Sequence, residues 1–196
     1  MKNLILTPNP YRDKNFHTLR CAMQILKDAG FQVKACLPFE VERSCELPKD
    51  IRFSRLDREM GNADLVICFG GDGTILHIAK AATKRGLPLL GVNIGTLGFM
   101  AELESTELDK LRLLAEGKYT IDNRMMLDVT VLREGRPVYN NIALNDAVVS
   151  KGSVARVVRL DVTTEEGRLT KITGDGGIVS TPCLLYTSPS PRDRQK

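Results

Sequence analysis

Residues 64–74 have the sequence DLVICFGGDGT, an unbroken apolar run that leads directly into a glycine-rich loop. An apolar run of this length is typical of a strand buried on both faces of a parallel sheet. The glycines after it allow a sharp turn and a close approach of the backbone to a ligand. Residues 74–84 then have a helical pattern, and the N-terminus of a helix offers free N–H groups and the positive end of a dipole. The stretch therefore predicts a strand, a loop suited to phosphate, and a helix.

Strand-like and helix-like segments alternate on both sides of this unit. Apolar runs indicate further strands at residues 4–6, 31–37 and 89–93. Helical spacing of apolar residues indicates helices over residues 15–29 and 105–116, whereas the polar residues 40–60 give no clear pattern. This alternation predicts a doubly wound parallel sheet, so we expect an N-terminal α/β domain over residues 1–123.

From residue 124 onward the apolar side chains recur at every second position. Residues 127–131 and 158–162 alternate apolar with polar side chains, and turn residues follow at 133–137 and 165–168. This period is typical of antiparallel hairpins with one buried and one exposed face. We therefore expect the start of an all-β domain over residues 124–182.

The last fourteen residues, CLLYTSPSPRDRQK at 183–196, do not continue this pattern. They have no periodicity, contain two Ser-Pro pairs, and resemble the in-frame translation of a common sequencing-library adapter. A natural disordered tail is the alternative. We expect a non-native tail joined after Pro182 and hence a truncated chain, which would leave strand edges and apolar faces uncovered. The 196-residue chain is accordingly expected to fold poorly and to have little activity.

The composition excludes several classes of function. The net charge is +4, and without the tail it falls to 25 basic against 23 acidic residues, with no basic run suited to a nucleic-acid backbone. The five cysteines form no Cys-x-x-Cys pair and there are only two histidines, so we expect buried, reduced thiols rather than a metal cluster. No apolar stretch has the length of a signal peptide core or a membrane span. We expect a cytoplasmic protein without a nucleic-acid or membrane partner.

Asp72 is the unusual member of the glycine loop, because its negative charge opposes phosphate binding. The acid makes sense if it accepts a proton from an attacking hydroxyl, or if it holds Mg²⁺ beside the phosphates. The alternative is an ordinary turn in which Asp72 caps the helix. On the loop alone, these interpretations are equally supported.

Three further motifs follow along the chain. They are NIGTLGF at 93–99, LND at 144–146, and GDGGIVSTP at 174–182. The glycines of the first allow close approach, and the side chains of Asn145 and Asp146 can hold a diol or a carboxamide. Taken singly, each motif has a simpler interpretation. The first would be a turn with a core phenylalanine, the second an Asx turn, and the third a flexible hairpin turn.

Together, and in this order, the four motifs resemble the ATP-NAD kinase family. The resemblance extends over residues 1–182, with the specific matches from residue 64 onward. It implies an α/β domain followed by a β-rich, NAD-binding domain. It also implies an enzyme that transfers the γ-phosphate of ATP to the 2′-hydroxyl of the adenosine ribose of NAD, giving NADP. A divalent metal, Mg²⁺, would assist as cofactor, without an assigned metal ligand in this chain. Asp72 would be the catalytic base toward the hydroxyl.

The resemblance further implies a set of nucleotide-binding residues, which are Asp72, Gly73, His77, Phe99, Asn145, Asp146, Arg156 and Asp175. Phe99 would line the adenine side, Asp146 would hold ribose hydroxyls, and Asp175 would meet the nicotinamide end, in some members from a neighbouring subunit. His77 and Arg156 have a simpler alternative as solvated side chains on a helix and a hairpin. A homodimer or homotetramer is also implied.

After residue 182 the chain departs from the family, which continues with a segment like TGSTAY that completes the NAD pocket. No site is therefore assigned to residues 183–196. Two other functions stay open. The first is a lipid kinase of the diacylglycerol-kinase type, which shares the GGDGT motif. The second is a non-catalytic NAD-binding module.

Overall fold

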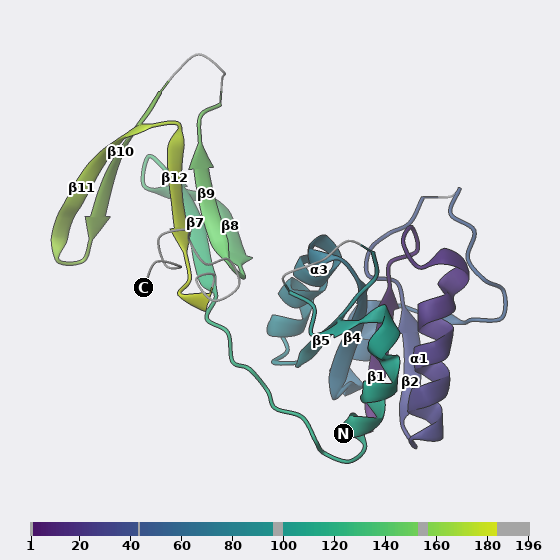
Figure 1. The fold of residues 1–196 in the computed structure, drawn as a ribbon. Coiled ribbons are helices and arrows are strands. Elements are labelled where there is room, and N and C mark those ends of the chain that lie inside the picture. Colours follow the sequence, from purple (N-terminus) through teal and green to yellow (C-terminus); the bar gives the residue numbers. More distant parts are fainter. Residues whose placement is uncertain (1, 43, 96–99, 153–156, 184–196) are drawn as a thin grey trace. The chain divides into compact units, whose positions relative to one another are not determined.

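The structure is a computed structural model that describes residues 2–42, 44–95, 100–152 and 157–183 (Figure 1). The chain divides into two units, Met1–Asp122 and Asn123–Lys196. Each unit is described by itself. The expected tail lies outside the described residues, except for Cys183.

A six-stranded parallel sheet forms the centre of the first unit, and its strand order is β3-β2-β1-β4-β5-β6. The strands are β1 (Asn3–Pro8), β2 (Gln32–Cys36), β3 (Phe53–Ser54), β4 (Leu65–Gly70), β5 (Leu89–Asn93) and β6 (Leu103–Glu104). The chain starts at β1, moves outward to β3, and returns to pair β4 with the other side of β1. It then moves outward in the opposite direction. This order confirms the predicted doubly wound sheet.

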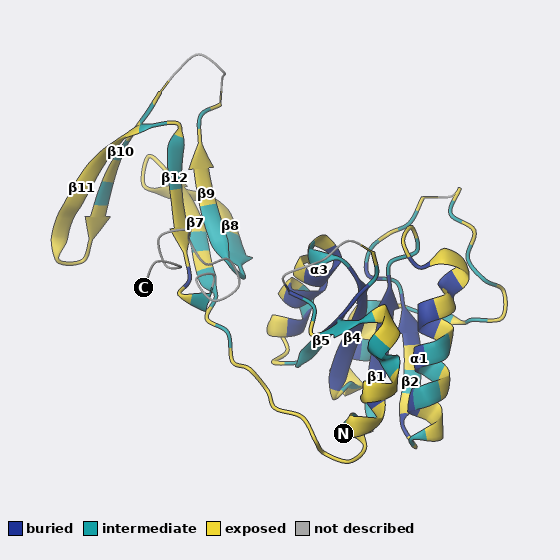
Figure 2. Ribbon diagram, viewed as in Figure 1, coloured by how far each residue is buried: buried dark blue, intermediate teal, exposed yellow. Residues whose placement is uncertain are grey.

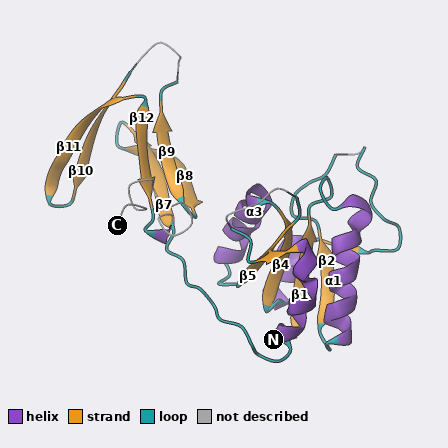
Figure 3. Ribbon diagram, in the orientation of Figure 1, coloured by secondary structure: helices purple, strands orange, loops and turns teal. Residues whose placement is uncertain are grey.

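Helices cover both faces of this sheet (Figure 3). The longer ones are α1 (His17–Asp28), α3 (Asp72–Thr83) and the 3₁₀ helix η3 (Ser105–Leu114). Side chains of α1 and η3 share one core with alternate strand residues such as Leu4, Leu6 and Ile67. On the other face, α3 packs so closely that a Cβ at Gly91 would lie 2.6 Å from Cδ1 of Ile75. The sheet is therefore buried on both sides, as the apolar run of β4 predicted.

Several element boundaries differ from those predicted. The helix predicted from residue 74 begins two residues earlier, at Asp72, because the extended Gly71 serves as its N-cap. The predicted helix at 105–116 is a 3₁₀ helix with a non-helical Glu107. The segment without a clear pattern contains β3, the short helix α2 (Leu56–Glu59) and the 3₁₀ turn η2 (Met60–Asn62). The 3₁₀ turn η1 (Lys14–Phe16) precedes α1.

The second unit contains three antiparallel pairs of strands, β7–β8, β9–β12 and β10–β11. The strands are β7 (Leu127–Arg133), β8 (Arg136–Ala143), β9 (Asp146–Ser150), β10 (Val158–Thr164), β11 (Gly167–Gly174) and β12 (Gly176–Ser180). Glu134 and Gly135 join β7 to β8 with positive φ angles of 52° and 74°. Positive φ at both residues is the geometry that a two-residue hairpin turn requires.

The expected contrast between two faces is present in β10, where the apolar residues 158, 160 and 162 are half-buried and the polar residues between them are exposed. It does not extend to every strand of this unit. Val148, Leu169 and Ile178 are 61%, 68% and 67% exposed, although each stands in a strand. Figure 2 shows these strands mostly exposed, whereas β1 and β4 of the first unit are buried. The alternation of apolar and polar side chains determines which face of a strand is apolar, but burial of that face requires another layer of structure packed against it.

The cysteines differ in their surroundings. Cys36 and Cys68 are buried in the first unit, and burial raises the pKa of both thiols to about 12. Cys21, Cys45 and Cys183 are half-buried, so the expectation of buried thiols holds for only two of the five. Across the described parts of the chain, no helix has both the length and the apolar character to cross a membrane.

Candidate active site

The glycine loop lies where the strand order of the sheet reverses, between the ends of β1 and β4. Ligands of doubly wound sheets bind in the crevice outside the carboxyl ends of the strands at this reversal. The two strand ends are joined here, because the backbone N–H of Asn9 donates to the carbonyl of Phe69 over 2.8 Å. The side chain of Asn9 also donates from Nδ2 to Oγ1 of Thr74 over 2.8 Å. Asn9 therefore fixes the loop after β1 against the first turn of α3.

The three glycines of the loop have different structural roles. A Cβ at Gly70 would lie 2.6 Å from Oγ1 and 2.7 Å from Cβ of Thr74, so the buried Thr74 excludes any side chain there. A Cβ at Gly71 or Gly73 would meet nothing within 4 Å. Gly70 is thus required by packing, whereas the open space beside Gly71 and Gly73 is room that a ligand can use.

Asp72 is the first residue of α3 and is half-buried. Its Oδ1 accepts a hydrogen bond from the backbone N–H of Met100 over 3.1 Å. Gly71, not Asp72, occupies the N-cap of the helix, so the capping interpretation of Asp72 is wrong. The hydrogen bond from Met100 restricts the orientation of the carboxylate at the edge of the loop.

Asn93 ends β5 at the same edge of the sheet, next to Gly70 in the register of the strands. Its Nδ2 lies 3.2 Å from Oε1 and 3.1 Å from Oε2 of Glu104, and donates to that carboxylate. Asn93 is 1% exposed, and its Oδ1 has no hydrogen-bond partner among the residues that the structure describes. A buried amide oxygen without a donor is costly, so this atom is one that a water or ligand could satisfy.

His77 lies on the exposed side of α3, and its ring contacts the edge of an aromatic pair. The ring centroids of His77 and Phe39 are 5.8 Å apart with an interplanar angle of 86°. Phe39 in turn stacks on Tyr11, with centroids 6.1 Å apart and planes 6° apart. Sequence reasoning singled out His77 but missed Phe39 and Tyr11, as well as Asn9. Only their place in the sequence could have indicated Asn9 and Tyr11, because both directly follow β1, the strand that pairs with β4.

The motifs of the second unit meet through the pairing of β9 with β12. Asp146 is opposite Ser180, and the carbonyl of Asn145 accepts from the backbone N–H of Thr181 over 2.9 Å. Asp175 lies at the other end of this pair, where its Oδ1 is 2.7 Å from Nζ of Lys151. At the ordinary rise of a strand, the two ends are about 17 Å apart. The pairing thus brings Asn145 and Asp146 together and separates them from Asp175.

Gly176 has a structural reason to be glycine. A Cβ on it would lie 2.1 Å from the carbonyl oxygen of Val149 and 3.0 Å from Cα of Ser150. The motif that contains Asp175 joins β11 to β12, and these two strands belong to different sheets. The simpler interpretation of this motif as a hairpin turn is therefore wrong. Among the expected site residues, Phe99 and Arg156 lie outside the described residues.

Within the described residues, no group of three or more His, Cys, Asp or Glu side chains is arranged to hold a metal ion.

The fold and the loop define a doubly wound α/β protein whose candidate site lies at the reversal of its strand order. The family profile of the ATP-NAD kinase N-terminal domain matches residues 5–119, more than half of the chain. The chain belongs to the ATP-NAD kinase family.

Individual relatives agree with this assignment. The NAD kinase of Acetivibrio thermocellus is 32% identical over 183 residues, which are 93% of this chain and 62% of the relative. The NAD kinase of Natranaerobius thermophilus is 42% identical over 121 residues, 61% of this chain and 42% of the relative. The chain thus spans less than two thirds of the length of these relatives.

A solved structure has the same fold. It is the crystal structure of yeast NADH kinase complexed with NADH, with a TM-score of 0.74 and 20% sequence identity. The match covers 100% of this chain and 60% of that one.

Proposed function

We propose that the complete protein is an NAD kinase, which transfers the γ-phosphate of ATP to the 2′-hydroxyl of the adenosine ribose of NAD. Family membership supports the reaction class, and the Acetivibrio thermocellus relative is an NAD kinase over 93% of this chain. The observation that carries the proposal is the placement of Asp72. It stands at the strand reversal, half-buried, beside two glycines with open space. The family match also disfavours the lipid kinase alternative.

In the proposed reaction, Asp72 acts as the base. The 2′-oxygen of the ribose forms a bond to the γ-phosphorus, the bond from that phosphorus to the bridging oxygen of ADP breaks, and the hydroxyl proton passes to the Asp72 carboxylate. The hydrogen bond from Met100 to Oδ1 orients the carboxylate at the edge of the loop, where the hydroxyl would approach it. Gly73 would allow the nucleotide to approach the first turn of α3, where backbone N–H groups suit phosphate.

The donor is proposed to be ATP with Mg²⁺. This ion is usually held by one or two carboxylates together with substrate phosphates, and no ligand for it is assigned among the described residues of this chain. When bound, the metal would neutralise charge on the transferred phosphoryl group.

The remaining nucleotide contacts are proposed from the family resemblance. Asn145 and Asp146 would hold NAD, with the carboxylate of Asp146 on ribose hydroxyls, which is compatible with their common position at one end of the β9–β12 pair. Phe99 and Arg156 would contribute further contacts. Asp175 would meet the nicotinamide end, and its distance from Asp146 along the strands fits a contact at a different part of the ligand or with a neighbouring subunit.

A homo-oligomer and a cytoplasmic location complete the proposal. The location is supported by the two buried thiols, which are stable as thiols in a reducing compartment.

The test uses the chain continued after Pro182 with the C-terminal segment of the Acetivibrio thermocellus relative, called the extended chain below. Purified extended chain should form NADP from NAD and ATP–Mg²⁺. Asp72→Asn should lower kcat by about 10²- to 10⁴-fold, because the base is lost, and should retain NAD binding in calorimetry.

Asp28→Asn provides the matched control, because Asp28 ends α1 and accepts a hydrogen bond from Nε2 of Gln24 on the exposed surface of that helix. This variant should keep the wild-type rate. An Asp72→Asn variant with the wild-type rate would remove the assigned role of Asp72, and an extended chain without NADP formation would contradict the proposed function.

A further inference from the structure

Three rings from distant parts of the sequence form a row beside the candidate site. Tyr11 lies in the loop after β1, Phe39 in the connection between β2 and β3, and His77 on α3. Tyr11 and Phe39 are stacked, and His77 meets Phe39 edge to face. Contacts of this geometry stabilise a defined ring orientation beyond what apolar burial provides.

The row is connected back to the glycine loop at its other end. The backbone N–H of Tyr11 donates to Oδ1 of Asn9 over 3.0 Å, and Nδ2 of Asn9 donates to Thr74. Thr74 and His77 are three residues apart on α3, so they are neighbours on the surface of that helix. The contacts therefore form a continuous chain that begins at Thr74 and ends at His77, both on the first turns of α3.

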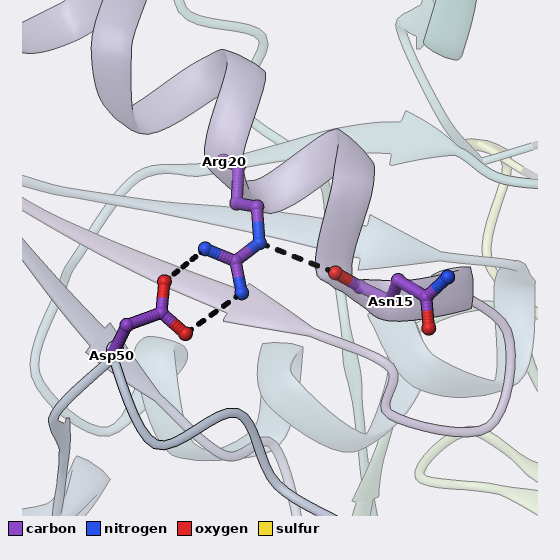
Figure 4. A network of polar contacts seen from close by, with 3 residues as sticks. All are labelled: Asn15, Arg20 and Asp50. Carbon is purple, nitrogen blue, oxygen red and sulfur yellow. Dashed lines mark hydrogen bonds and ion pairs between the residues drawn. The ribbon is translucent and has the colours of Figure 1, made fainter.

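The connection that carries Phe39 is held at two places. The backbone N–H of Glu42 donates to the hydroxyl oxygen of Tyr11 over 3.1 Å. Further along, the guanidinium of Arg20 binds both carboxylate oxygens of Asp50, with 2.9 Å between Nη2 and Oδ1 (Figure 4). Nε of Arg20 also donates to the carbonyl of Asn15 over 3.3 Å. Both anchors lie C-terminal to Phe39, and β2 ends three residues before it, at Cys36, so the chain is held before and after Phe39.

We propose that Phe39, supported by Tyr11, is a positioning residue that orients the imidazole of His77 toward the nucleotide. The connection between β2 and β3 then forms one wall of the nucleotide site. His77 is exposed, and without a neighbouring ring its side chain would sample several rotamers before binding. Prior ordering of a contact residue improves affinity because less entropy is lost on binding. The inference rests on the proposed function, which supplies the nucleotide.

A first experiment tests the contact without any activity. The chain has only two histidines, so the ring signals of His77 and His17 are readily distinguished by NMR. Phe39→Leu removes the ring current and should shift the His77 signals, whereas His17, on α1 beside Cys21, serves as the internal reference. Unchanged His77 signals would overturn the inference and leave the proposed function untouched.

A second experiment tests the role, using kinetics of the extended chain. Phe39→Leu should raise KM for NAD by roughly two- to tenfold, the range of one aromatic pair, with kcat nearly retained. His77→Ala should raise KM at least as much. The double variant should be no worse than His77→Ala alone, because Phe39 acts through His77. Phe39→Tyr keeps the ring and should restore the wild-type KM.

Phe53→Leu is the matched control. Phe53 is also half-buried, and its ring pairs with Phe16 at 5.5 Å rather than with a residue of α3. This variant should lose some thermal stability without a change in KM. Additive effects of Phe39→Leu and His77→Ala, or an equal rise of KM in Phe53→Leu, would overturn the inference. Absence of NADP formation by the wild-type extended chain would instead overturn the proposed function, and with it the role of Phe39 but not the ring contact.

Discussion

The two units use similar strand residues in opposite ways. Ile67 in β4 is 0% exposed between two layers of helices, whereas Ile178 in β12 is 67% exposed. In the first unit, packing on both faces fixes the sheet and hence the ends of its strands, where the candidate site lies. In the second unit, backbone pairing and the contact at Gly176 define the register, but no apolar face of the described strands is fully buried, because their apolar side chains are at most half-buried. Two-stranded pairs without such a face are only marginally stable in water.

The largest expected effect tests this contrast with the same substitution in each unit. Ile67→Ala should destabilise the first unit by about 2–5 kcal/mol, because it leaves a cavity in a closed core. Ile178→Ala should change stability by no more than about 0.5 kcal/mol, as is usual for an exposed side chain.

Urea unfolding followed by circular dichroism at the helix wavelength measures Ile67→Ala, and amide hydrogen exchange of residues in β9 and β12 measures Ile178→Ala in the second unit. The chain has no tryptophan, and the helices described here with more than four residues belong to the first unit, so this signal reports on it. Equal losses in the two variants would mean that the second unit has a core of its own, contrary to the comparison.

A smaller effect concerns the glycines of the two glycine-rich motifs. Gly70→Ala would force the buried Thr74 aside and weaken its hydrogen bond with Asn9, with an expected cost of about 1–3 kcal/mol. Gly174→Ala is the counterpart in the second unit, where a Cβ would meet nothing within 4 Å. We expect this variant to melt at the wild-type temperature in calorimetry, while Gly70→Ala melts at a lower temperature. A wild-type melting temperature for Gly70→Ala would show that Thr74 can move at no cost.

The sequence predicted best what depends on local pattern. The apolar run 65–70 identified β4 because a strand buried on both faces needs no polar positions. The helical spacing over residues 15–29 identified α1, which ends at Asp28, and the φ of +87° at Gly30 shows why a glycine follows the helix. The alternation in the second part predicted its hairpins, and the departure from the family after residue 182 led us to expect the exposed apolar side chains that these strands have.

What the sequence could not predict are contacts between residues far apart in the chain. Tyr11, Phe39 and His77 have no shared periodicity, and only the folded sheet brings their loops together. The hydrogen bond from Met100 to Asp72 likewise joins two loops 28 residues apart. The roles of Asp72 and the other nucleotide-binding residues therefore stay predictions, because the resemblance names them and the geometry alone does not assign them.

The smallest expected effect concerns the ion pair that anchors the long connection of the first unit. The hydrogen bond from Arg20 lowers the pKa of Asp50 from 3.8 to about 2. A carboxyl whose pKa is lowered by folding stabilises the folded state above its ordinary pKa. That contribution is lost as the pH falls from near 4 through about 2. Both side chains are well exposed, so the effect on overall stability should be slight.

The titration of the Asp50 carboxyl by carbon NMR measures this directly, with a midpoint expected near 2. Arg20→Gln should return the midpoint toward 3.8 and should leave the pKa of Asp57 unchanged, because the low pKa of Asp57 comes from its own bond with Arg55.

The same substitution releases one of the two anchors of the segment that carries Phe39. The His77 ring signals should therefore shift less than in Phe39→Leu, because the second anchor, from Glu42 to Tyr11, is retained. A shift as large as that of Phe39→Leu would mean that the Asp50 anchor alone holds the wall in place.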